Sequence, residues 1–193
     1  MNKAEKKPVL VKLFCGLLLA KESHLDAVLE KLKEYYGEID LVVGPFSFDE
    51  FSNYYEQEMG VELRRYFISF KKLVDRIDLP EIKNASITIE KTFSDDNNKR
   101  KINIDPGYLT LGQVFLASTK DNFCRIYIRD GIYAEVTLRF VKDTYTAFPY
   151  TYKDYRSEKY LAFFNEVRKI YKDQGRGLIV PACLQKEVGE KTF

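Results

Sequence analysis

Hydrophobic side chains recur along this chain with two different periods, which predict its strands and helices. An apolar run over residues 9–20 predicts a buried strand. Over residues 23–37 the apolar side chains fall on one helical face, with Ser23 as the expected N-cap and a glycine at the exit. A second apolar run at residues 39–43 predicts another strand. Strand, amphipathic helix and strand in close succession predict an N-terminal βαβ unit.

The rest of the chain continues to alternate between these periods, without an internal repeat or a linker long enough to divide it. We therefore expect a single α+β domain over residues 9–174, with a mixed, largely antiparallel sheet packed by three or four helices. Residues 1–8 and 184–193 are expected to be flexible tails. The further elements expected are a strand at 63–74, a helix from Asp78 to Phe93, a strand at 102–105, a helix at 110–119, a hairpin at 124–140 and a helix from Ser157 to Tyr171.

The N-terminal apolar run has a second interpretation, as the core of a signal peptide. Three lysines precede it, as in the charged region of such a peptide. However, Lys12 interrupts the run, and Leu18 occupies a position where a small residue would favour cleavage. The run is also shorter than the roughly 20 apolar residues that span a bilayer. We therefore favour a buried strand and a protein with no membrane segment.

Charge and cysteine content narrow the compartment and the partners. The chain has 31 Lys and Arg against 29 Asp and Glu, and a net charge of +2 does not favour nucleic acid or an anionic membrane as a partner. Its three cysteines, at positions 15, 124 and 183, are odd in number and far apart, which is typical of free thiols in a reducing cytoplasm. His24 is the only histidine, so a catalytic triad based on histidine is available only through it.

The hairpin at 124–140 places four large polar side chains on one face. With a three-residue loop at 129–131, Tyr127 pairs with Tyr133 and Arg125 with Glu135. This face is either a binding surface for an anionic group or a solvated surface stabilised by its own cross-strand pairs. The opposite, apolar face would pair Ile128 with Ile132, Ile126 with Ala134 and Cys124 with Val136.

Two further segments supply candidate ligand-binding residues. In the stretch DPGY, Asp105 and Tyr108 flank Pro106 and Gly107, a favoured central pair for a type II turn, so the Asp105 carboxylate either supports that turn or binds a ligand. The stretch YTYKDYR contains Tyr152, Tyr155 and Arg156 as candidates for ring stacking and anion binding. The alternative is a tyrosine-rich segment that packs on the sheet.

The acidic and aromatic segment at 48–60 is the only candidate for a metal site. Asp49, Glu56 and Glu58 are weak candidates for Mg²⁺, which binds carboxylates together with water. A solvated helix face explains the same residues without a metal. No cysteine or histidine pair has the spacing of zinc ligands.

Several stretches together resemble an uncharacterised prokaryotic family known as domain of unknown function 4416. The resemblance extends from Val11 to Tyr171 and includes the DPGY element. It implies no established activity and no catalytic residues. The stretches that carry it are FSFDEFSNYYEQEMG, LRRYFISFKKLV, NIDPGYLTLGQVFLASTKD, RIYIRDGIYAEVTLRF and YTYKDYRSEKYLAFFNEV.

Three functions are compatible with these observations. The first is a cytoplasmic binding or accessory domain whose polar aromatic sheet face recognises a small anionic ligand or a protein partner, with self-association left open. The second is an enzyme that uses carboxylates, with or without Mg²⁺, on a phosphorylated or nucleotide-like substrate. The third is RNA binding through exposed aromatic and arginine side chains, which the small net charge disfavours.

Overall fold

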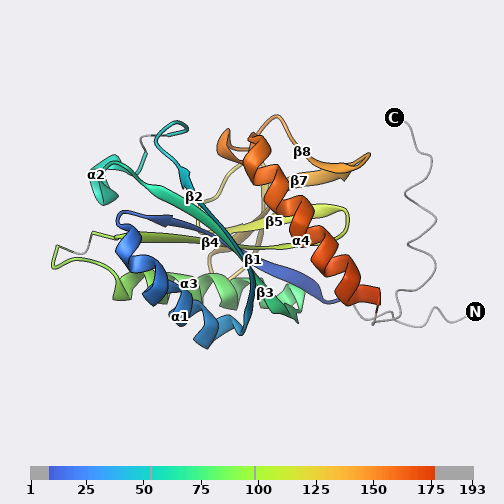
Figure 1. Cartoon of the computed structure of the whole chain (residues 1–193), viewed down its shortest axis with the longest axis horizontal. Helices are drawn as coiled ribbons and strands as arrows, with labels where there is room; N and C mark the ends of the chain where they lie inside the picture. The colour runs from blue at the N-terminus through green and yellow to red at the C-terminus, as the bar shows by residue number, and fades with distance from the viewer. Residues whose placement is uncertain (1–8, 53, 98, 177–193) are drawn as a thin grey trace, which may run out of the picture.

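The computed structural model describes residues 9–52, 54–97 and 99–176, which form one α+β domain built on a single sheet (Figure 1). Eight strands make up this sheet. They are β1 (Val11–Leu19), β2 (Ile39–Ser47), β3 (Arg64–Val74), β4 (Ile102–Leu109), β5 (Gln113–Ser118), β6 (Arg125–Arg129), β7 (Ile132–Val141) and β8 (Thr144–Ala147).

The strands are arranged in the order β2-β3-β1-β4-β5-β7-β6, and β8 pairs with β7 outside this path. Every neighbouring pair is antiparallel. The predicted βαβ unit is present, since β1 and β2 run parallel to each other on the two sides of β3 and a helix connects them.

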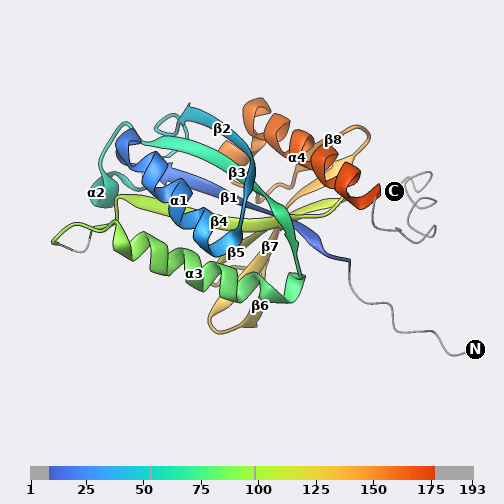
Figure 2. The same ribbon diagram turned by 60° about the horizontal axis from the view of Figure 1, so that its bottom comes forward.

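Four α-helices accompany the sheet in the described residues: α1 (Leu25–Tyr36), α2 (Glu56–Met59), α3 (Leu79–Thr92) and α4 (Glu158–Arg176). Helices α1 and α3 lie side by side on one face, and α4 lies on the other (Figure 2). Alternation along β1 explains the two cores, because Leu13, Cys15 and Leu17 face α1 and α3, whereas Phe14 packs under α4. None of the described helices is long and apolar enough to cross a membrane.

Three of the four predicted helices begin within a few residues of the expected positions, but the polar side chains expected at their starts form no capping bonds. A short 3-10 turn, Glu22–His24, precedes α1, and the N-cap residue of the helix is His24. Asp78 is the N-cap residue of α3 and its side chain makes no capping bond. The Ser157 hydroxyl is buried and has no hydrogen-bond partner in the described part of the chain. Packing of the apolar helix faces therefore stabilises these helices more than their caps do.

The helix predicted at 110–119 is wrong, because these residues form the turn between β4 and β5 and then β5 itself. Thr110 closes the turn, since its hydroxyl accepts hydrogen bonds from the backbone N–H groups of Gly112 and Gln113. Along β5, Val114 faces the core under α4 and Phe115 faces the opposite side. The side chains thus alternate with the period of two that defines a strand.

The type II turn predicted at Pro106–Gly107 is also wrong, because both residues lie inside β4. They pair with Cys15 and Phe14 of β1, and Gly107 does not have a positive φ. Glycine is required there for space, since a Cβ atom would lie 2.1 Å from the Phe115 carbonyl oxygen. The DPGY stretch therefore belongs to the centre of the sheet rather than to a loop.

The register of the hairpin formed by β6 and β7 is confirmed, but its loop differs from the prediction. Tyr127 pairs with Tyr133 and Arg125 with Glu135, as expected. Only two residues form the turn, Asp130 with a φ of 55° and Gly131 with a φ of 75°. At the strand ends Arg129 pairs with Ile132, where Ile128 was expected to do so, and an irregularity between Tyr127 and Arg129 restores the register. Ile126 pairs with Ala134 as predicted, whereas Cys124 precedes the strand.

Candidate functional site

A cleft of about 1050 Å³ lies near the start of α4 at Glu158, and its lining comes from both faces of the sheet, because residues of α3 contribute to it as well as the segment before α4. Its walls are the segment around α2, helix α3 and the segment that connects β8 to α4. Strands β3, β4, β5 and β7 contribute side chains to its floor. Cys183 and the predicted tail at 184–193 lie outside the described residues, as does the tail at 1–8.

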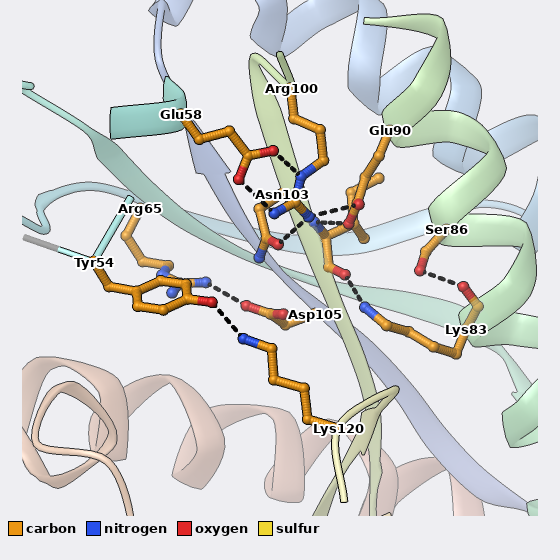
Figure 3. Close-up of polar contacts among 11 residues, drawn as sticks. Tyr54, Glu58, Arg65, Lys83, Ser86, Glu90, Arg100, Asn103, Asp105 and Lys120 are labelled. Carbon is orange, nitrogen blue, oxygen red and sulfur yellow. Dashed lines mark hydrogen bonds and ion pairs between the residues drawn. The ribbon is translucent and has the colours of Figure 1, made fainter. Parts of the chain in front are cut away.

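The cleft lies where β4 and β5 separate. Their ladder covers only Gly107 to Leu109 on β4, and it stops at Pro106, which has no N–H group to donate. Beyond that point, two side chains of α3 replace the missing strand partner of Ile104. The Glu90 carboxylate accepts from the Ile104 N–H at 2.7 Å, and the Lys83 ammonium donates to the Ile104 carbonyl at 2.8 Å (Figure 3). The sheet thus stays open here without leaving these backbone groups unpaired.

Arg100 holds the α2 segment against this opening. Its guanidinium forms a bidentate pair with Glu58 of α2, at 2.6 and 2.8 Å. The remaining nitrogen donates to Glu90 at 3.0 Å and to the side-chain oxygen of Asn103 at 3.1 Å (Figure 3). A bidentate pair fixes both partners in orientation as well as distance. Arg100 therefore connects the wall of the cleft to its floor.

Arg65 lies at the centre of the floor between two carboxylates. Its side chain is 3% exposed, and its nitrogens lie 3.1 Å from Asp105 and 3.7 Å from Asp154. Gly16 of β1 leaves the space for this arrangement, since a Cβ atom there would lie 3.1 Å from the guanidinium and 3.3 Å from the Tyr155 hydroxyl. The glycine in an otherwise bulky strand thus permits a buried arginine.

The two carboxyl groups beside Arg65 differ in their acidity. Burial acts to raise the pKa of Asp105, but the positive charges of Arg65 and Lys83 outweigh it and hold that pKa below its usual value. Burial raises the pKa of Asp154, and the charge of Arg65 only partly offsets this. Of the two groups, Asp105 is therefore the stronger acid and Asp154 the more readily protonated.

A second polar cluster, here called the Arg125 corner, occupies the hairpin side of the cleft. The Arg125 guanidinium donates to Glu135 at 3.0 Å, to the Lys120 carbonyl at 2.9 Å and to the Tyr152 hydroxyl at 3.2 Å. The side chains of Arg125 and Glu135 are only 6% and 4% exposed, so this ion pair is buried rather than solvated. All three guanidinium nitrogens are used by the protein. Arg125 is thus a structural centre of the corner rather than a free anion-binding fork.

Lys120 lies at the mouth of the cleft. Its ammonium donates to the Tyr54 hydroxyl at 2.6 Å and lies 4.5 Å from the centre of the same ring (Figure 3). Among the described residues, Lys91, Lys120 and Lys153 are exposed lining residues that form no ion pair with a carboxylate. The lining as a whole has seven Lys or Arg against five Asp or Glu. The cleft is therefore positive at its rim.

The predicted binding residues divide into two groups. Asp105, Arg125, Glu135 and Tyr152 line the cleft together. The others lie elsewhere: Tyr108 stacks on Phe115 toward α3, Tyr127 and Tyr133 form a ring pair further along the hairpin, and the Arg156 guanidinium donates to the carbonyls of Thr151 and Pro149.

The weak metal candidates are not brought together. Asp49 accepts hydrogen bonds from the backbone N–H groups of Glu62 and Leu63, and Glu58 pairs with Arg100. Glu56 is exposed at the start of α2. Within the described part of the chain, no group of three or more His, Cys, Asp or Glu residues is arranged to hold a metal ion.

Several residues of the cleft were not found from the sequence. The sequence pattern does indicate two of them, because each is a charged residue at a buried position. Arg65 lies on the same inward face of β3 as Phe67, and Lys83 lies on the buried side of α3 beside Ile82. A charged residue at such a position must find a partner, which marks it for attention. The residues missed in this way are Arg65, Lys83, Glu90, Arg100, Asn103, Lys120 and Asp154.

Comparison with known proteins identifies the family of this chain but no relative of known function. No curated protein and no solved structure matches it. One family model, described as a domain of unknown function (DUF4416), matches residues 9–171, which includes every strand and helix that contributes to the cleft. The chain therefore belongs to the DUF4416 family.

Proposed function

We propose that this protein is a binding domain whose cleft holds a small anionic molecule. The observation that supports this most strongly is the surplus of positive charge at the rim of a deep cleft, where Lys91, Lys120 and Lys153 form no ion pairs within the described residues. The cleft volume of about 1050 Å³ is slightly above the roughly 300–1,000 Å³ typical of sites for small molecules, so a ligand of that size fits with room to spare.

The walls of the cleft suit a molecule that has a flat or apolar part beside its charge. Aromatic side chains stand on both sides and offer ring faces and edges for packing. Their contacts with one another, such as the 5.0 Å separation of the Tyr54 and Tyr55 rings, hold several of them in place before a ligand arrives. The aromatic lining residues are Phe48, Phe51, Tyr54, Tyr55, Tyr152 and Tyr155.

Calorimetry with a panel of anions tests this proposal. The panel consists of inorganic phosphate, ribose 5-phosphate, AMP, citrate and, as an uncharged control, adenosine. We expect at least one phosphate compound to bind, with an affinity that falls as salt is added, because exposed charges are screened. Failure of every anion to bind at millimolar concentration would refute the proposal.

Matched lysine variants locate the binding. Lys120→Met and Lys153→Met each remove one exposed charge from the rim, and each should weaken binding about tenfold, or roughly 1.4 kcal/mol. Lys72→Met and Lys172→Met remove the same charge from exposed positions outside the cleft. Equal losses in all four variants would indicate a general effect of net charge and contradict a site in the cleft.

The unequal carboxyl groups beside Arg65 favour a second candidate function, an enzyme that acts on a phosphorylated substrate. Two carboxyls whose pKa values are moved in opposite directions are suited to act as base and acid, here Asp105 and Asp154. Phosphorus NMR of the same phosphate compounds, incubated with the protein, tests this function. Conversion that Asp154→Asn abolishes while binding persists would support it, and unchanged compounds would oppose it.

A further inference from the structure

The carboxylate of Glu135 presents one buried oxygen that has no hydrogen-bond partner. Glu135 lines the cleft, and the residue is 3% exposed. Its Oε2 atom accepts from Arg125 and, at 3.5 Å, from the Cys124 thiol, whereas Oε1 has no donor among the described residues. Buried carboxylate oxygens nearly always accept at least one hydrogen bond, so this atom has an acceptor position that a group from outside the protein can fill.

The charge of Glu135 determines what kind of donor fits. Arg125 already compensates the negative charge, since the two side chains form a buried ion pair. A further cation would leave the corner with an excess positive charge in a poorly solvated place. A neutral hydroxyl or amino group donates a hydrogen bond without changing the charge, and it is therefore the better partner.

The surroundings of Glu135 indicate what the donor is attached to. Arg125 binds the Glu135 carboxylate, the Lys120 backbone and the Tyr152 hydroxyl at once, so these three groups belong to one corner of the cleft. The ammonium of Lys120 lies on the rim against the Tyr54 ring. An acceptor, two aromatic rings and a cation that forms no ion pair within the described residues thus line the same cleft. Because the Arg125–Glu135 pair is neutral overall and Lys120 forms no ion pair within the described residues, the anionic end of the ligand is better placed toward Lys120.

We propose that the Arg125 corner binds a phosphorylated sugar, alone or within a nucleotide. A sugar hydroxyl donates to Glu135 Oε1, the ring packs against Tyr54 and Tyr152, and the phosphate lies beside Lys120. This inference rests on the proposed function, since it specifies the ligand of the same cleft. The Tyr155 hydroxyl, a second buried group with no hydrogen-bond partner among residues 9–52, 54–97 and 99–176, lies on the floor beside Arg65 and offers another bond to a polar substituent.

Calorimetry with deoxy analogues tests the role of the hydroxyl on the unmodified protein. The compounds are AMP, 2′-deoxy-AMP, 3′-deoxy-AMP, ribose 5-phosphate and 2-deoxyribose 5-phosphate. We expect at least one deoxy analogue to bind at least tenfold more weakly than its parent, because the loss leaves Glu135 Oε1 without a donor. The free sugar phosphates show whether the sugar alone suffices or the base also contributes.

The outcomes separate the two proposals. If the phosphates bind and the deoxy analogues bind equally well, the hydroxyl contact is refuted while an anion site stands. If no phosphate binds, both proposals fail. Glu135→Gln adds a check on the residue itself. The NH₂ group of the amide is a donor and does not accept a hydrogen bond from the sugar hydroxyl. The affinities of the parent and deoxy compounds should therefore come within about twofold of each other. Should this variant not fold, the comparison of analogues on the wild-type protein still decides.

Discussion

Gly107 offers the sharpest test of the packing in the centre of the sheet. A Cβ atom on this residue would lie 2.1 Å from the Phe115 carbonyl oxygen and 2.6 Å from Cζ of Phe14. The oxygen belongs to the backbone of β5, and Phe14 is fully buried, so neither atom has room to retreat. Overpacking a core typically costs 1–3 kcal/mol. For Gly107→Ala we expect a loss in the free energy of unfolding of about 3 kcal/mol or more.

Urea denaturation measures this loss, and two further variants identify its cause. Gly112→Ala is the matched control, because nothing lies within 4 Å of its Cβ position, and it should change stability by less than about 1 kcal/mol. Gly107→Asn distinguishes crowding from backbone strain. In a left-handed turn Asn would be tolerated better than Ala, whereas in a crowded strand it should be at least as harmful. A Gly107→Ala protein within about 0.5 kcal/mol of wild type would refute this reasoning.

Three other predictions concern the buried charges of the cleft. Arg125→Met should lower the free energy of unfolding by about 3 kcal/mol, because it leaves Glu135 buried without its ion-pair partner. Adding Glu135→Leu should restore part of this loss. No recovery in the double variant would contradict the reasoning. Glu90→Ala should lower the free energy of unfolding by about 1–3 kcal/mol, because the Ile104 N–H loses its acceptor. Truncating a surface glutamate of α1 should lower it by less than about 1 kcal/mol. Equal losses for the two variants in denaturation would argue against the contact of Glu90 with Ile104. Burial holds the pKa of Asp154 above its unfolded value of about 3.9, so the stability that this group contributes is present below that pH and is lost as the pH rises through the folded pKa. The stability of Asp154→Asn relative to wild type should therefore increase as the pH rises from about 4 to 7. Thermal melts in which the difference between the two proteins stays constant or decreases across that range would contradict the shift.

The sequence predicted most elements because hydrophobic periodicity reports local geometry. It failed at β5, where six residues are too few to separate a strand from a helix once Gly112 is assigned to a helix interior rather than to a turn. It also failed at Pro106 and Gly107, which resemble a turn in isolation. Their actual roles depend on distant partners, since the proline ends the β4–β5 ladder and the glycine makes room for Phe14.

The candidate site was predictable only where its contacts are local. The pairing of Arg125 with Glu135 follows from the register of one hairpin, and this prediction is confirmed. The contact of Arg65 with Asp105 joins residues 40 positions apart, and their meeting depends on the order of strands β3, β1 and β4. Strand order is a property of the whole fold, so one sequence does not reveal which charged residues converge across it.

The binding site itself is tested most directly by NMR mapping of AMP on the isotope-labelled protein. If the cleft binds this ligand, amide shifts should concentrate in the segments that line it, at residues 116–120, 54–58 and 152–155. The exposed Tyr127 on the outer part of the hairpin and the outer surface of α1 should remain unchanged. Saturable shifts confined to the cleft segments are the predicted result. Shifts centred on Tyr127 and Tyr133, or scattered over the surface, would contradict a ligand site in the cleft.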